Sequence, residues 1–198
     1  MKKEMCRAMK EDMGREEFFT ELVEVMVCIE FCTHTVDYLD AHMKDVECDP
    51  SIVFAPSHSK LRFEPLGVAL IMGSWNYPYF VTLKPLIQSI AAGNCAIVKP
   101  SELAPCSAKI IQVLVEKYLD PNCFKVVQGG AETAIALTNS HFDIICFTGS
   151  TEKGKLVAKA AAQNLTPCIL ELGGKCPVIL DDSTNLSFAA FKICAGKF

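Results

Sequence analysis

The fold is decided between Val68 and Val98, where the chain reads VALIMGSWNYPYFVTLKPLIQSIAAGNCAIV. Its two ends, residues 68–72 and 95–98, are short apolar runs without charge, which is typical of buried strands. The stretch between them, residues 79–92, is long and periodic enough for a helix. A strand, a crossover helix and a second strand form the unit from which parallel sheets are built.

The same alternation continues along the chain. Apolar runs predict further strands at 125–127, 143–147 and 176–180, and helical periodicity predicts helices at 102–118, 131–138, 152–163 and 185–197. Two serines stand where helix N-caps are expected, Ser101 before the first of these helices and Ser150 before the third. Strands that alternate with helices indicate an α/β protein with a doubly wound parallel sheet.

The first 60 residues have a different pattern. Between residues 16 and 44, apolar side chains recur at intervals of three and four, which predicts one long amphipathic helix. They are Phe19, Leu22, Val23, Met26, Val27 and Ile29. Asp49, Pro50, Pro56 and Ser57 then indicate an irregular connector.

Composition excludes several classes of protein. With 51% apolar residues, 21% charged residues and a net charge of -4, the chain has material for a core but no basic surface for nucleic acid. Its eleven cysteines are scattered without paired spacing, which favours reduced thiols. Cys28, Cys32 and His34 lack the second ligand pair of a metal site, so none is predicted. The N-terminus lacks the apolar run of a signal peptide, so we expect a cytoplasmic protein.

The longest uncharged stretch, residues 65–83, is long enough to cross a bilayer. Gly67, Gly73, Asn76 and Pro78 would break an isolated helix in lipid, where nothing satisfies the freed backbone groups. A buried strand followed by a loop explains the stretch better, and no membrane segment is expected in this chain.

Doubly wound sheets bind ligands beyond the carboxyl ends of their strands, so residues at those ends are the candidate site. Four motifs stand there and would face the same edge of the sheet. They are Gly73-Ser74-Trp75-Asn76-Tyr77-Pro78, Lys99-Pro100-Ser101-Glu102, Phe147-Thr148-Gly149-Ser150-Thr151 and Glu171-Leu172-Gly173-Gly174-Lys175.

Two of these motifs suit a dinucleotide. The turn at Gly149 and Ser150 presents free N–H groups of a helix start to a pyrophosphate, although such a turn can equally be a plain helix cap, and no G-x-G-x-x-G is present. Lys99 and Glu102 can hydrogen-bond the hydroxyls of a ribose, or they can be a solvated pair. A carboxylate there favours NAD over NADP, but NADP stays possible.

The other two motifs suit catalysis. The side-chain amide of Asn76 could donate to a developing oxyanion, or Asn76 could be a turn former. Glu171, beside two glycines, could take a proton from water, or it could cap a turn.

In this order, the four motifs resemble the successive signatures of the aldehyde dehydrogenase superfamily. Residues 65–67, 119–121 and 126–130 most resemble its class 3 branch, which includes fatty and aromatic aldehyde dehydrogenases. The resemblance implies NAD(P)-dependent oxidation of a small aldehyde to a carboxylic acid through a cysteine thiolate. It makes Glu171 the general base and Asn76 an oxyanion donor. It implies a cofactor site at Lys99, Glu102, Gly149, Ser150, Thr151, Glu152, Lys153, Gly154 and Leu172.

The resemblance also implies an organisation. Residues 1–60 would be an N-terminal helical segment and connector, and residues 61–198 a partial, Rossmann-like dinucleotide-binding domain without the catalytic and oligomerisation parts. Full-length relatives would be homodimers.

One departure from the family concerns the nucleophile. The family's cysteine stands in a G-Q-x-C context that does not occur here, and Cys176 and Cys194, the only cysteines after Glu171, are predicted to be core residues. Two hypotheses follow: part of an aldehyde dehydrogenase that is inactive by itself, or a non-catalytic module that binds a dinucleotide or packs against a partner. A related acyl-phosphate or semialdehyde reductase fits the Glu171 motif poorly.

Overall fold

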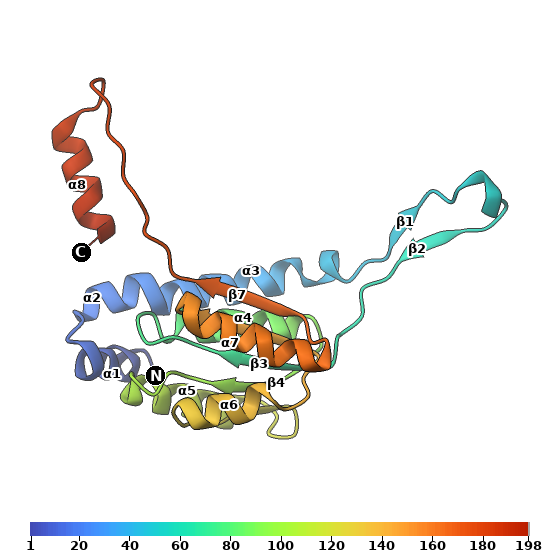
Figure 1. The fold of residues 1–198 in the computed structure, drawn as a ribbon, viewed down its shortest axis with the longest axis horizontal. Helices are drawn as coiled ribbons and strands as arrows, with labels where there is room; N and C mark the ends of the chain where they lie inside the picture. Colours follow the sequence, from blue (N-terminus) through green and yellow to red (C-terminus); the bar gives the residue numbers. More distant parts are fainter. Residues whose placement is uncertain (198) are drawn as a thin grey trace.

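The computed structural model describes residues 1–197 and contains a five-stranded parallel sheet of order β5-β4-β3-β6-β7 (Figure 1). The strands are β3 (Val68–Met72), β4 (Cys95–Lys99), β5 (Phe124–Val126), β6 (Ile144–Gly149) and β7 (Cys168–Leu172). The chain begins the sheet at its centre and winds first to one side and then to the other. The prediction of a doubly wound α/β sheet is therefore confirmed.

Helices cover both faces of the sheet. On one face lie α4 (Phe80–Ala91) and α5 (Pro105–Tyr118), and on the other lie α6 (Ala131–Thr138) and α7 (Thr151–Ala161). Successive residues of a strand point to opposite faces, so Ile71 packs toward α4 while Leu70 packs toward α7. The two hydrophobic cores are thus divided by the sheet.

The N-terminal helices join the core on the α4 side. They are α1 (Lys2–Met13), α2 (Glu17–Thr20), a π-helical turn (Glu21–Val25) and α3 (Met26–His42). Met5, Cys6 and Met9 of α1 lie in the same cluster as Val98 of β4. The predicted single helix from 16 to 44 is therefore interrupted, and α1 was not predicted because charged residues separate its methionines.

The predicted apolar stripe of the long helix is largely wrong. Phe19, Leu22, Met26 and Ile29 are exposed, and the buried residues of this segment are Thr20, Glu24, Val25 and Cys28. A π-helical turn has one more residue than an α-helical turn, so it moves the buried face of the helix away from the position that regular spacing predicts.

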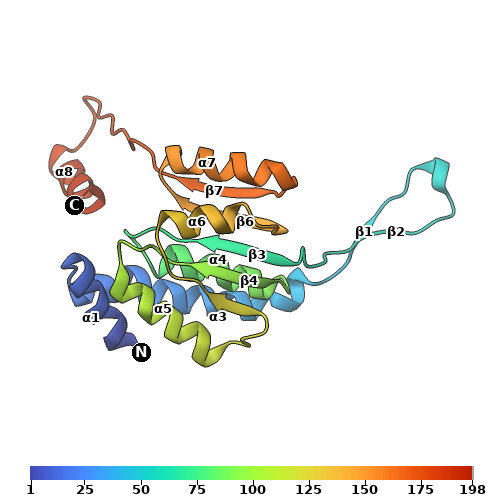
Figure 2. The same ribbon diagram turned by 60° about the horizontal axis from the view of Figure 1, so that its bottom comes forward.

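The predicted connector contains a β-hairpin that extends away from the sheet (Figure 2). Its strands, β1 (Val46–Cys48) and β2 (Ser59–Leu61), pair antiparallel around a 3₁₀ turn (Ile52–Phe54). Three-residue strands are too short to show the alternation by which strands are recognised.

The predicted strand at 176–180 is wrong. That segment is exposed and forms no strand, and β7 begins eight residues earlier at Cys168. A short 3₁₀ turn (Ala162–Asn164) after α7 returns the chain directly to the free edge of β6, where Cys168 pairs with Ile145. The more apolar run lies too far along the chain to take this edge.

Residues 173–197 extend away from the sheet and include α8 (Leu186–Lys197) (Figure 1). The bounds of α8 nearly match those of the helix predicted at 185–197. Cys176 and Cys194 lie in this part and are exposed, so their prediction as core residues is wrong. The prediction failed because apolar neighbours alone do not show whether a segment packs on the sheet.

Of the two predicted helix caps, one is confirmed. The Ser150 hydroxyl accepts a hydrogen bond from the Lys153 N–H at 3.3 Å at the start of α7. Ser101 does not cap α5, which begins at Pro105 after a turn. Proline suits the first helical position because its missing N–H is not needed there.

Candidate functional site

The carboxyl ends of four strands meet at one edge of the sheet. The register places Met72 beside both Lys99 and Phe147, and Thr148 beside Glu171. All four motifs therefore lie at the same edge, as predicted. The winding direction changes between β3 and β6, so this edge includes the switch point at which doubly wound sheets bind ligands.

The turn after β3 presents the Asn76 side chain to solvent. The Ser74 hydroxyl donates to Asn76 Oδ1 at 2.7 Å, so the amide oxygen is occupied and the two N–H groups of Nδ2 are left to donate. α4 lies close behind this turn, since a Cβ on Gly73 would lie 2.0 Å from the Thr82 hydroxyl. Only glycine allows this approach.

Lys99 ends β4 as a buried cation. Its ammonium donates to Glu102 Oε2 at 3.0 Å and to the Pro100 carbonyl at 3.2 Å, and its side chain is 6% exposed. Burial acts to raise the pKa of Glu102, but its own backbone N–H and the Lys99 ammonium outweigh this effect and lower it. Glu102 is therefore a carboxylate at neutral pH, partly exposed at the edge.

The turn between β6 and α7 presents the start of a helix to the same edge. Gly149 ends the strand and Ser150 caps the helix, while the N–H groups of Thr151 and Glu152 have no acceptor within it. Gly154 packs against Leu172, where a Cβ would lie 2.6 Å from a leucine methyl. Glu152 and Lys153 are exposed beside the turn.

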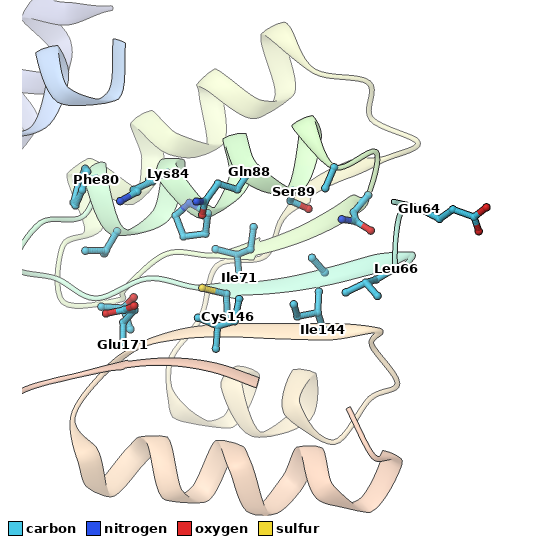
Figure 3. Close-up of a pocket in the computed structure, with 17 residues that line it drawn as sticks. Glu64, Leu66, Ile71, Phe80, Lys84, Gln88, Ser89, Ile144, Cys146 and Glu171 are labelled. Carbon is cyan, nitrogen blue, oxygen red and sulfur yellow. The ribbon is translucent and has the colours of Figure 1, made fainter. Parts of the chain in front are cut away.

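Glu171 lies in β7 rather than after it, on the α4 side of the sheet. It stands at one end of a groove of about 610 Å³ between β3, β6, β7 and α4 (Figure 3). Cys146 lies in the same groove, where burial and the Glu171 carboxylate raise the pKa of its thiol to about 11. The thiol beside Glu171 is therefore protonated and is a poor nucleophile.

A family model described as Aldehyde dehydrogenase family matches residues 1–198. The chain belongs to the aldehyde dehydrogenase family. Aldehyde dehydrogenase family 3 member A2 of Rattus norvegicus is 51% identical over 135 residues, which are 68% of this chain and 28% of that protein. Other relatives also bear family 3 names, including member H1 of Arabidopsis thaliana at 37% identity. This agrees with the predicted class 3 branch.

Solved structures of the family share the fold. The structure described as the substrate bound state of Staphylococcus aureus AldH is 38% identical with a TM-score of 0.95, and the match covers 98% of this chain and 42% of that one. An aldehyde dehydrogenase of Mycobacterium tuberculosis complexed with NAD⁺ is 27% identical with a TM-score of 0.81, over 92% and 37% of the two chains. The chain spans about two fifths of the length of the curated relatives that it matches first.

Two contacts to the Asn76 turn could not be predicted from the sequence of this aldehyde dehydrogenase chain. Arg15, between α1 and α2, donates to the Asn76 carbonyl, and Glu24, in the π-helical turn, accepts from the N–H groups of Tyr79 and Phe80. Gly14 marks the end of α1 and was the available signal that Arg15 follows a helix, but no local pattern connects Arg15 with residue 76.

The described residues contain no cluster of three or more His, Cys, Asp or Glu side chains that could hold a metal ion. Among residues 1–197, no helix has the length and apolar character needed to cross a membrane.

Proposed function

We propose that these residues belong to an enzyme that oxidises an aldehyde to a carboxylic acid with NAD⁺ or NADP⁺. In this proposal they bind the dinucleotide and supply the general base and one oxyanion donor. Membership of the aldehyde dehydrogenase family supports the reaction, and the relative complexed with NAD⁺ supports the cofactor. The observation that carries the proposal is the meeting of all four motifs at the edge of the sheet that includes its switch point.

The residues present fit a dinucleotide. The start of α7 offers unpaired N–H groups and the positive end of the helix dipole to a pyrophosphate, with no side chain on Gly149 in the way. Lys99 and Glu102 offer a donor and an acceptor to the two ribose hydroxyls. When bound, the nicotinamide accepts the hydride that leaves the substrate carbon.

Thr151, Glu152, Lys153, Gly154 and Leu172 complete the proposed cofactor site. The first three surround the helix start, where backbone N–H groups and the Lys153 ammonium favour a phosphate and the Glu152 carboxylate opposes it. Gly154 and Leu172 act through their mutual contact, which fixes the distance of α7 from β7.

The catalytic groups lie on the α4 side of the same edge. The Asn76 amide would donate to the substrate oxygen as negative charge develops there, and the Glu171 carboxylate would take a proton from the water that hydrolyses the acyl intermediate. The thiolate that attacks the aldehyde is not assigned to any of the eleven cysteines, since none has the G-Q-x-C context. Oxidation therefore requires residues outside these 198.

We further propose a cytoplasmic protein that forms homodimers in its full-length form. All eleven cysteines are free, which supports a reducing compartment. Ile52, Val53 and Phe54 at the tip of the hairpin are exposed apolar side chains, which supports contact with another chain.

The alternative is a module that binds a dinucleotide, or only packs on a partner, without catalysis. Its support is the missing cysteine context. Calorimetric titration of the purified chain with NAD⁺ and NADP⁺ separates dinucleotide binding from packing on a partner alone. We expect binding that Lys99→Met weakens and that Lys109→Met, an exposed lysine of α5, leaves unchanged. Absence of binding by the folded chain would contradict the proposed cofactor site.

The same protein tests the assignment of the nucleophile. With NAD⁺ and an aliphatic or aromatic aldehyde, we expect no absorbance from NADH. Its formation would show that one of the eleven cysteines is the nucleophile after all, with Cys176 and Cys194 the first to be replaced by alanine.

A further inference from the structure

The guanidinium of Arg15 connects the N-terminal helices to the turn that carries Asn76. Its Nη1 donates to Glu24 Oε1 at 2.9 Å, and its Nη2 donates to the backbone carbonyl of Asn76 at 2.7 Å. It also lies over the Tyr77 ring, 4.6 Å from the ring centre. The Arg15 side chain is 16% exposed and its Glu24 partner is fully buried, while its contact with the Asn76 carbonyl lies at the surface.

Glu24 holds the other end of the same turn. This carboxylate is fully buried, and its Oε2 accepts hydrogen bonds from the N–H groups of Tyr79 at 2.9 Å and Phe80 at 3.0 Å. Burying a carboxylate is costly unless it is paired and hydrogen-bonded. Here three hydrogen bonds offset that cost, and two of them cap α4 from a different part of the chain.

Together, the two side chains hold the turn from its Asn76 carbonyl to the start of α4. Gly14, with φ of 68°, ends α1 in the left-handed conformation and allows the chain to turn so that Arg15 reaches residue 76. The π-helical turn that contains Glu24 is a further irregularity, of a kind found often at functional sites. Two irregular backbone segments thus place the two partners.

We infer that Arg15 and Glu24 are positioning residues that fix the Asn76 amide. The carbonyl that Arg15 binds belongs to Asn76 itself, so the contact fixes the peptide plane from which this side chain extends. The Ser74 hydroxyl then orients the side-chain amide. The catalytic meaning of this fixed amide rests on the proposed function, since Asn76 is an oxyanion donor only there.

A structural ion pair would stabilise the helices without ordering the turn, and the chain allows the two roles to be separated. Trp75, next to Asn76, is its only tryptophan, so tryptophan fluorescence reports on this turn alone. The N–H of Tyr77 belongs to the peptide plane that Arg15 holds. Its ¹⁵N order parameter measures the same contact directly.

Three variants test the inference in the chain without cofactor. Glu24→Gln keeps an oxygen for the α4 cap but removes the acceptor of Arg15. Arg15→Lys keeps the charge but loses the fork that reaches two acceptors. The double variant Arg15→Met/Glu24→Gln leaves no unpaired buried charge and protects the fold. The control is Arg7→Met/Glu11→Gln, which removes an exposed ion pair of α1.

We expect the double variant to lower the Tyr77 order parameter from about 0.85 to below about 0.6. Quenching of Trp75 by acrylamide should increase in parallel. Arg15→Lys should be intermediate, and the α1 control should match the original chain. The inference is overturned if the folded variants lose thermal stability while Tyr77 and Trp75 remain as ordered as before, because the pair is then structural only.

The Tyr77 and Trp75 measurements need no dinucleotide, so their outcome does not depend on whether the proposed function is correct. Loss of order in the turn of a chain that binds no NAD⁺ would refute the proposed function and retain the positioning of Asn76. Normal NAD⁺ binding by variants whose turn stays ordered would refute the positioning of Asn76 and retain the proposed function.

Discussion

A Cβ atom on Gly154 would lie 2.6 Å from Cδ2 of Leu172 and 3.2 Å from its Cδ1. Gly154 is buried in α7 and Leu172 ends β7, so this contact sets how closely the helix approaches the edge strand. The start of the same helix forms the proposed pyrophosphate site. The distance between α7 and β7 therefore links the packing of the sheet to cofactor binding.

Replacing Gly154 by alanine should move α7 away from β7. We expect a loss of about 1–3 kcal/mol in the free energy of unfolding, as for other overpacked cores, reduced by the gain in helix propensity. NAD⁺ affinity should fall as well. Urea unfolding and calorimetric titration measure the two effects. Gly196→Ala in α8 is the control, because nothing lies within 4 Å of its added Cβ. Equal stability of the two variants would contradict the close contact.

The carboxylate of Glu102 should favour NAD⁺ over NADP⁺. It is paired with Lys99 at 3.0 Å and would repel a 2′-phosphate on the ribose. Removing one charge at about 4 Å in water is worth about 1 kcal/mol, so Glu102→Gln should improve the ratio of NADP⁺ to NAD⁺ affinity by roughly fivefold. Titrations with both dinucleotides measure it.

Glu116→Gln, at the far end of α5, is the matched control and should leave the ratio unchanged. If Glu102→Gln also leaves it unchanged, Glu102 does not lie near the 2′ position.

Local patterns were enough to predict most of the sheet and the edge at which the motifs meet. The run Val68–Met72 is a central strand with both faces covered, so its apolar character is continuous and unmistakable. β7 is an edge strand whose apolar run is interrupted by Glu171, so the more apolar stretch 176–180 was predicted in its place. Which of two neighbouring segments forms an edge strand depends on the length of the loop before it, and an apolar pattern does not show this length.

The rest of the site could not be read from local patterns. Arg15 and Asn76 are 61 residues apart, and neither has neighbours that indicate the other. Glu24 lies outside the apolar stripe that regular helical spacing predicts, yet it is fully buried, within a π-helical turn. The Arg15–Asn76 contact and the burial of Glu24 both depend on tertiary packing, which local sequence patterns do not show.

Burial of Glu24 should make stability depend on pH. Burial raises its pKa from the ordinary value of 4.5 to about 6, against the opposing effects of the Phe80 and Tyr79 N–H groups and Arg15. The folded state thus holds this proton more tightly than the unfolded chain. The stability it contributes is fully present below pH 4.5 and is lost as the pH rises through 6.

A pKa difference of that size corresponds to about 2 kcal/mol, which should be lost between these pH values. Urea unfolding from pH 4 to 8, compared with Glu24→Gln, isolates the effect, because the variant has no proton to lose. Glu11→Gln retains Glu24 and should retain the dependence. If the original chain and Glu24→Gln show the same pH dependence, Glu24 does not keep its raised pKa in solution.

Cys146 should resist alkylation although it lies in the groove with Glu171. Burial and the carboxylate raise the pKa of its thiol to about 11, so little thiolate exists at neutral pH. Cys48, Cys176 and Cys194 are exposed and should react with iodoacetamide much faster, as measured by mass spectrometry of peptides from the folded chain at pH 7.5.

Glu171→Gln removes the nearby negative charge and should increase the rate at Cys146, while the rates at the exposed cysteines stay the same. Rapid labelling of Cys146 in the original chain would show that its thiol is ionised and accessible, and would make it a candidate for the nucleophile. A rate at Cys146 that is slow and unaffected by Glu171→Gln would instead show that the two groups do not interact, and that burial alone controls this thiol.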